Sequence, residues 1–184
     1  MALNWQLDKE YISIIDDIIA LDDVQRLETF VHHHYTNRLA HSISVSYRSY
    51  RWAKRLGLNK EAVARAGLLH DLFFYDLAVK DEVGGKGHLY EHPRIALNNA
   101  MKLVELSDLE QDIILKHMFG ATLDIPKYAE SWIVTFMDKE AAISEVIHGS
   151  LSELKQNLEH TAQVYSKLIK PALFFNTKTD KLTN

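Results

Sequence analysis

The stretch Ala66-Gly67-Leu68-Leu69-His70-Asp71-Leu72 sets an imidazole and a carboxylate side by side in an otherwise apolar segment. Burying a charged Asp in such a run is costly unless a positive charge compensates it. A divalent metal is the strongest local compensation available to a protein. His70 and Asp71 therefore predict a metal site, whose other ligands should come from neighbouring helices.

The composition is that of an ordinary globular protein. The chain has 184 residues, which favours one domain with a single core. Hydrophobic residues make up 47% and charged residues 25%, and the net charge of -4 gives no overall basic field to recruit nucleic acid. The absence of cysteine excludes disulfides, thiolate metal sites and a cysteine nucleophile.

The N-terminal residues Met1-Ala2-Leu3-Asn4-Trp5-Gln6 lack the basic and apolar blocks of a signal peptide. No apolar stretch approaches the roughly 20 residues that span a bilayer. We therefore expect a cytoplasmic protein without membrane association. A homo-oligomer is compatible with this composition.

Few breakers and long periodic segments predict an all-α protein, since the chain holds only 3 prolines and 7 glycines. Gly57 fits a helix C-cap, Asn59 an N-cap, Pro93 a first helical position, and Ser107 with Glu110 a capping box. The expected helices cover residues 11–20, 22–33, 37–56, 59 to about 71–75, 93–105, 108–117, 128–149 and 150–169.

Four further residues carry ligand chemistry in helical contexts, namely His41, His92, His117 and Asp138. Helices that converge with inward-facing His and carboxylates commonly build metal sites in bundles. Without sulfur, such ligands suit Fe, Mn, Ni, Zn, Co or Mg ions. Four His and two Asp fit either one octahedral ion with outer helpers or two divalent ions bridged by a carboxylate.

Several other residues are interpreted as structural. A lone His is more often structural than a ligand, so His88, His148 and His160 are expected to be surface or structural residues. The run His32-His33-His34 falls at an expected helix end, where at least two of the side chains should face solvent. Gly84-Gly85-Lys86-Gly87 lacks P-loop spacing and predicts a turn or a flexible lid.

The order His41, His70-Asp71, Asp138 resembles the H…HD…D signature of the HD superfamily of metal-dependent phosphohydrolases. Arg38-Leu39-Ala40-His41-Ser42-Ile43-Ser44-Val45 is similar to the first motif, an Arg followed by His-Ser and a Val. Residues 66–71 resemble the second motif and Asp138-Lys139 the last. The resemblance covers about residues 36–145 and implies one HD-domain helical bundle over residues 1–184, with helical N- and C-terminal extensions.

The resemblance also implies the roles of the ligands. A first ion would be held by His41, His70, Asp71 and Asp138. Asp71 would bridge to a second ion and act as the catalytic residue, while His92 and His117 would bind that second ion or contact substrate and water. The sequence Leu72-Phe73-Phe74 after the pair departs from the HDxGK arrangement of the cyclic-dinucleotide branch.

The expected reaction is hydrolysis of a phosphate ester by metal-activated water. The cations expected to bind the substrate, by their position near the motifs, are Arg38, Lys86, Arg94 and Lys139. Each of them also fits a solvated surface cation. The run Phe73-Phe74-Tyr75 fits either nucleobase stacking or the core, so the sequence leaves open monoester or diester, and nucleotide or other small molecule.

Two other classes of function fit the same residues. A non-catalytic HD-type module could keep a metal for stability or bind a nucleotide as a sensor. Oxygenase chemistry at a di-iron centre occurs in a few relatives of the superfamily. Because every position of the basic signature is filled, the phosphohydrolase is the favoured prediction.

Overall fold

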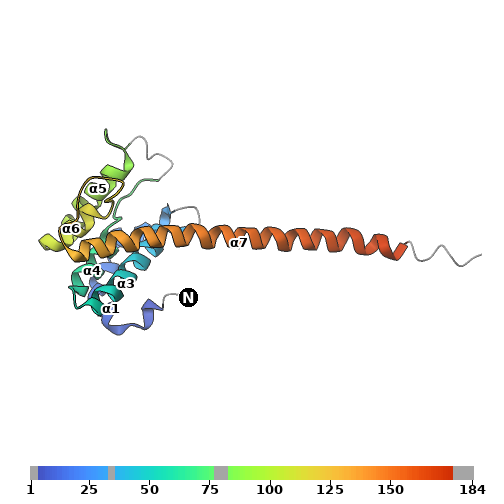
Figure 1. Ribbon diagram of the computed structural model, residues 1–184, viewed down its shortest axis with the longest axis horizontal. Helices are drawn as coiled ribbons and strands as arrows, with labels where there is room; N and C mark the ends of the chain where they lie inside the picture. The colour runs from blue at the N-terminus through green and yellow to red at the C-terminus, as the bar shows by residue number, and fades with distance from the viewer. Residues whose placement is uncertain (1–3, 33–35, 77–82, 176–184) are drawn as a thin grey trace, which may run out of the picture. The chain divides into compact units, whose positions relative to one another are not determined.

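The computed structural model describes residues 4–32, 36–76 and 83–175, and its fold is helical apart from one short sheet (Figure 1). The sheet pairs β1 (Val31–His32) antiparallel with β2 (Thr36–Asn37). The all-α prediction is confirmed. The helices of the described part are η1 (Trp5–Leu7), α1 (Lys9–Ile19), α2 (Asp22–Gln25), η2 (Arg26–Thr29), α3 (Arg38–Leu56), α4 (Lys60–Leu69), α5 (His88–Leu103), α6 (Asp108–Lys116) and α7 (Ala129–Phe175).

The chain divides into two units, Met1–Glu145 and Val146–Asn184. The hydrophobic core and every candidate site residue lie in the first unit. The second unit contains the later turns of α7, and its Leu151, Leu154 and Leu158 are exposed. Among the described helices, none combines the length and apolarity of a membrane span. One HD domain over all 184 residues stays a prediction.

The central helices α3 and α4 begin where their N-caps predict, and α3 also ends where Gly57 predicts. The Asn37 side chain accepts a hydrogen bond from the Ala40 N–H at the start of α3, and Asn59 does the same for Ala62 at the start of α4. Gly57 ends α3 with a φ of 69°, a left-handed conformation that glycine adopts without strain. These caps fix both ends of α3 and the start of α4, the two helices that carry the first two motifs.

The helices α3 and α4 lie close together at Gly67. A Cβ atom on Gly67 would lie 2.9 Å from Ser46 Cα. The Ser46 hydroxyl donates to the Ala64 carbonyl (2.6 Å) and accepts from the Tyr11 hydroxyl (2.7 Å), which joins α1 to the same contact. The Gly67 carbonyl also accepts from His70 Nδ1, so this packing reaches the candidate site.

The predicted helix over residues 22–33 is wrong beyond its first turns. The helix α2 stops at Gln25, η2 follows, and the chain is extended from Phe30. The Phe30 carbonyl accepts a hydrogen bond from the Arg38 N–H, so this segment pairs with the start of α3 instead of continuing as a helix. His32 therefore lies in a strand, and His33-His34 lie outside the described residues.

The helix α5 begins five residues before its predicted start at Pro93. Gly87 has a φ of 81° and its carbonyl accepts hydrogen bonds from the N–H groups of Tyr90 and Glu91, which starts the helix early. Pro93 lies inside α5. It has no N–H to donate, so the helix lacks one backbone hydrogen bond there, and its side chain is buried. The early start adds His88 to the helix.

Two further boundaries differ from their predictions. The helix α4 ends at Leu69, before residues 71–75, and His70 is its C-cap. The predicted helices over residues 128–149 and 150–169 are one helix, α7, which continues through Gly149 and Pro171. A single glycine inside a helix costs only about 1 kcal/mol and does not force a break.

We expect Gly67→Ala to destabilise the fold by about 1–3 kcal/mol, because the added methyl group meets the α3 backbone and not a movable side chain. Denaturant unfolding measures the change. Gly85→Ala is the matched control, since a Cβ there meets nothing within 4 Å. Equal stability of the two variants would contradict the close approach.

Candidate metal centre

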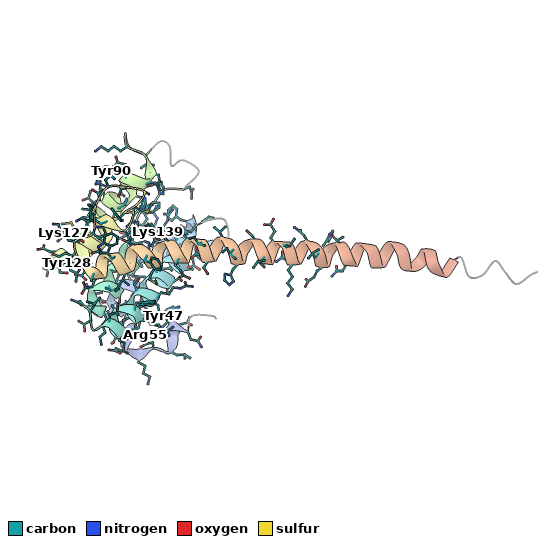
Figure 2. All side chains as sticks on the ribbon, viewed as in Figure 1. Tyr47, Arg55, Tyr90, Lys127, Tyr128 and Lys139 are labelled. Carbon is teal, nitrogen blue, oxygen red and sulfur yellow. The ribbon has the colours of Figure 1, made fainter. Side chains whose placement is uncertain are left out.

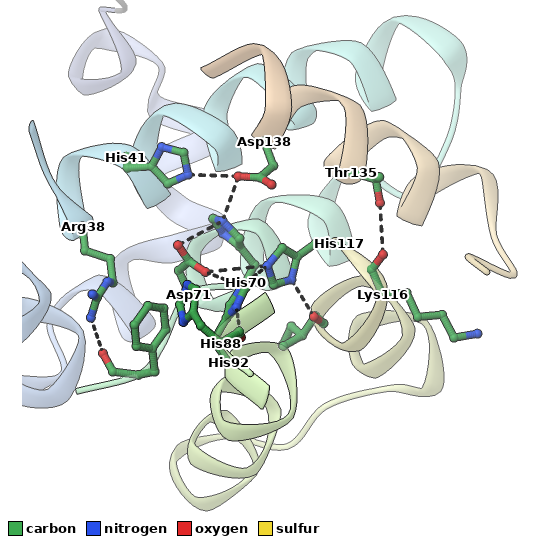
Figure 3. A network of polar contacts seen from close by, with 12 residues as sticks. Arg38, His41, His70, Asp71, His88, His92, Lys116, His117, Thr135 and Asp138 are labelled. Carbon is green, nitrogen blue, oxygen red and sulfur yellow. Dashed lines mark hydrogen bonds and ion pairs between the residues drawn. The ribbon is translucent and has the colours of Figure 1, made fainter. Parts of the chain in front are cut away.

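Five elements bring the six predicted ligands to one place (Figure 3). His41 lies in the first turn of α3, His70-Asp71 directly follows α4, and His92 lies in α5. His117 is the C-cap of α6, and Asp138 lies in the third turn of α7. Packing of α3 on α4, and of α4 and α5 on α6, draws these positions together. The four imidazoles and Asp71 are buried.

The Asp71 carboxylate faces ligands on two sides. Its Oδ1 lies 3.5 Å from His92 Nε2 and 3.6 Å from His117 Nε2, and its Oδ2 lies 3.8 Å from His70 Nε2. On the His70 side, Asp138 Oδ1 lies 3.6 Å from His70 Nε2. One carboxylate thus separates two groups of ligands, the arrangement expected for a bridging residue.

Three histidines are held in the same tautomer by backbone carbonyls. The Nδ1 atoms of His70, His92 and His117 lie 2.8, 2.9 and 2.8 Å from the carbonyls of Gly67, His88 and Ile114. A carbonyl only accepts, so each Nδ1 carries the proton and each neutral ring presents an Nε2 lone pair to the cluster. Such an orientation through the second ring nitrogen is typical of metal-ligating histidines.

The resulting lone pairs need a cation. His92 Nε2 and His117 Nε2 lie 2.9 Å apart although both are acceptors, and His70 Nε2 is buried with no hydrogen-bond partner. Three of the residues, His41, His70 and Asp138, have one ligand atom each within 4.8 Å of one another, as do His70, Asp71 and His117. The residues present therefore fit one or two divalent metal ions.

The comparisons show which family the chain belongs to. A family model described as the HD domain matches residues 38–143, which is more than half of the chain. The chain belongs to the HD domain family. Searches of curated proteins and of solved structures found no match. The recognition of the family from His41, His70-Asp71 and Asp138 is confirmed.

His41 of this HD domain lies between two carboxylates. Its Nε2 is 3.0 Å from Asp138 Oδ1, and its Nδ1 is 2.9 Å from Glu145 Oε1. The other Glu145 oxygen is buried without a hydrogen-bond partner. Glu145 is seven residues after Asp138, so the two lie on the same face of α7, two turns apart. This spacing could have revealed Glu145 from sequence, but it was missed.

Protons occupy part of the site when no metal competes for it. Burial alone would lower the pKa of His41, but its hydrogen bonds to Asp138 and Glu145 raise it to about 10. Burial likewise opposes protonation of His70, but the Asp71 and Asp138 carboxylates raise its pKa above the ordinary value. His41 and His70 are therefore the rings that a metal must deprotonate.

On the other side of Asp71, the imidazoles of His92 and His117 are neutral. Burial and the neighbouring His70 and His92 lower the pKa of His117 to about 3, and burial lowers that of His92. Burial would raise the pKa of Asp71, but the surrounding imidazoles hold it far below its usual range. His92 and His117 therefore offer free lone pairs beside an ionised carboxylate near neutral pH.

A cavity of about 190 Å³, which we call the chamber, opens onto the cluster. Two histidines that the sequence did not predict for the site line it, His32 from β1 and His88 from α5. The His32 ring stacks on His41 with centroids 3.9 Å apart, and His88 stacks on His92 at 4.5 Å. The run His32-His33-His34 could have indicated His32 as a site residue. The helix predicted over residues 22–33 instead placed its side chain incorrectly, because His32 lies in β1.

The predicted substrate-binding cations occupy three different places. Lys139 lines the chamber, and its Nζ donates to the carbonyls of His117 (3.3 Å) and Thr135 (3.4 Å). Arg38 is fully buried behind the cluster. Lys86 and Arg94 lie beside Tyr90 and do not line the chamber. Lys139 and Tyr90 are labelled on α7 and α5 in Figure 2.

We expect Glu145→Gln to weaken metal affinity roughly tenfold and Glu145→Ala up to a hundredfold, because His41 loses the carboxylate that orients it and strengthens its basicity. Competition with a fluorescent chelator measures the affinity. Glu140→Gln, which alters an exposed partner of Arg48 on the same helix, is the control and should bind metal like the unaltered protein. Wild-type affinity in both Glu145 variants would refute this role.

Metal binding should release protons and strengthen as the pH rises from about 7 to 10. The pKa of His41 is raised to about 10, so this ring is protonated at neutral pH and must lose a proton to bind an ion, and the carboxylates beside His70 raise its pKa in the same direction. Titration calorimetry in two buffers of different ionisation enthalpy counts the protons. A binding heat independent of buffer at pH 7 would contradict the assignment.

Proposed function

We propose that the protein is a metal-dependent phosphohydrolase that cleaves a phosphate ester with water activated at this centre. The observation that carries the proposal is the convergence of buried Nε2 lone pairs on the two sides of the Asp71 carboxylate. Membership of the HD domain family, which consists largely of hydrolases, supports it. A small phosphate ester or nucleotide is the proposed class of substrate.

The proposed ligands divide at Asp71. His41, His70 and Asp138 would hold one ion together with Asp71, and His92 and His117 would hold a second ion together with the same carboxylate. Imidazole and carboxylate ligands suit Fe, Mn, Ni, Zn, Co or Mg ions. When bound, a divalent ion lowers the pKa of water and polarises a phosphoryl oxygen, which supplies the nucleophile and the Lewis acid.

The residues of the chain supply the rest of the site. Lys139 is half-buried at the chamber, where burial lowers its pKa and the adjacent Asp138 opposes that shift. Its ammonium is fixed by two carbonyls and can donate a third hydrogen bond to a phosphoryl oxygen. Phe73, Leu89 and Met118 add apolar walls to the chamber in which the phosphoryl group would react.

For Arg38 we infer a positioning role. Its guanidinium donates to the carbonyls of Phe73 (2.6 Å) and Tyr75 (3.1 Å) and lies 3.5 Å from the centre of the Phe73 ring. These contacts hold the segment that follows Asp71 in one conformation. Arg38 thus acts on the site through residues 73–75, while Lys139 contacts the phosphoryl group directly.

Phosphate release from small phosphate esters, measured with added Mn²⁺, tests the function. We expect Asp71→Asn to lower the rate on the order of a hundredfold or more and to reduce bound metal, because it removes the charge that both groups of ligands share. Asp108→Asn, an exposed position at the start of α6, should retain activity. Circular dichroism checks that both variants fold.

A folded, metal-loaded protein that binds nucleotides but hydrolyses no phosphate ester would overturn the enzyme proposal. That outcome would favour the non-catalytic sensor. Activity in Asp71→Asn equal to that of the unaltered protein would instead overturn the assignment of the centre.

A further inference from the structure

The chamber is too small to enclose a large substrate. Its volume of about 190 Å³ is below the roughly 300–1,000 Å³ of sites that bury a whole drug-sized ligand. Its lining includes the metal-ligand candidates Asp71, His92, His117 and Asp138, together with Lys139. The chamber therefore has room for a phosphoryl group and little more.

A larger cavity, which we call the groove, adjoins the chamber. The groove has a volume of about 630 Å³ and is lined by residues 86–90 at the start of α5 and by residues 121–124 after α6. His88 and Leu89 line both the groove and the chamber. A molecule bound with its phosphoryl group in the chamber would extend past these two side chains into the groove.

The lining of the groove suits an uncharged organic group. Asp124 is neutralised by Arg94, whose Nη2 lies 2.7 Å from Asp124 Oδ2. Arg94 does not itself line the groove, and Lys86 is the one Lys or Arg among the lining residues, where it lies over the Tyr90 ring at 4.3 Å. Polyphosphate chains are bound by several charge-assisted hydrogen bonds, which one lysine does not supply.

The apolar part of the groove comes from both of its sides. Leu89 is half exposed on α5, and Leu123 is 94% exposed on the opposite segment, with Ala121 beside it. Exposed leucines that face a common cavity are a surface that an apolar ligand can cover.

We propose that the substrate is a phosphate monoester whose phosphoryl group occupies the chamber and whose leaving alcohol, an uncharged and largely apolar group of about nucleoside size, occupies the groove. The inference rests on the proposed hydrolase function. A bond forms between water oxygen and phosphorus, the bond from phosphorus to the alcohol oxygen breaks, and that oxygen takes up a proton. The alcohol leaves through the groove and inorganic phosphate leaves from the chamber. Within the part of the chain that the structure describes, this groove is the cavity seen to share lining residues with the chamber, and room for one substituent favours a monoester over a diester.

Two monoesters with similar leaving-group chemistry test this division, phenyl phosphate and 2-naphthyl phosphate. In the metal-loaded, unaltered protein, kcat/KM should be about tenfold higher for the naphthyl ester, because its second ring buries more apolar surface. Thr122→Trp fills the groove and Leu123→Asp removes an apolar wall at an exposed position that does not endanger folding. Both should abolish the naphthyl preference, because kcat/KM falls more for the naphthyl ester than for the smaller phenyl ester, while metal content stays unchanged.

Ile125→Trp is the matched control, since Ile125 is exposed nearby but does not line the groove. It should keep the preference. Equal naphthyl preference in Thr122→Trp, Leu123→Asp and Ile125→Trp would overturn the groove proposal, and so would faster hydrolysis of diphenyl phosphate than of phenyl phosphate.

Binding of non-hydrolysable analogues separates this proposal from the hydrolase proposal. Calorimetry with benzylphosphonate and 2-naphthylmethylphosphonate should show tighter binding of the naphthyl analogue, lost in Thr122→Trp. If that result holds while no ester is hydrolysed, the groove is upheld as a binding site and the enzyme proposal fails. If hydrolysis occurs without any naphthyl preference in rate or binding, the enzyme stands and the groove proposal fails.

Discussion

The ionised Asp71 carboxylate, buried where α3, α4, α5 and α6 meet, is the constraint on which the rest of the site depends. A buried charge needs compensation from every direction, and three Nε2 atoms surround it within 3.8 Å. At His92 and His117 these atoms present lone pairs and not protons, because backbone carbonyls take the Nδ1 protons and burial lowers the pKa of both rings. The protein alone thus leaves acceptors facing acceptors, and a cation resolves that conflict. Metal binding and the packing of the first unit are therefore coupled.

The rings of two ligand candidates, at the ends of two helices, are oriented in the same way. His70 and His117 are the C-caps of α4 and α6, and each donates through Nδ1 to the carbonyl three residues earlier, that of Gly67 or Ile114. The last carbonyls of a helix lack intrahelical partners, so a C-cap imidazole satisfies one of them and gains a fixed ring orientation. A single local interaction both ends the helix and aims the ligand.

Much of this site could be predicted because its signals are local. An acid in an apolar run identifies Asp71 and Asp138, and caps at Asn37 and Asn59 place the helices that carry the motifs. The misplaced parts depend on tertiary contacts. The pairing of Phe30 with Arg38, which sets His32 beside His41, and the buried Pro93 inside α5 have no local signature. At these two places, burial and long-range pairing contributed more to the free energy of folding than local secondary-structure propensity did.

Buried Arg38 links the first motif to the wall between chamber and groove. Its guanidinium holds the Tyr75 carbonyl, and the Tyr75 hydroxyl lies 2.8 Å from His88 Nδ1. The His88 carbonyl in turn accepts from His92 Nδ1, so one chain of contacts runs from α3 through the segment after Asp71 to a ligand on α5. The His88 ring also stacks on the His92 ring, with centroids 4.5 Å apart. His88 therefore connects the lining shared by the chamber and the groove to a ligand of the proposed centre, through its backbone carbonyl and through its ring.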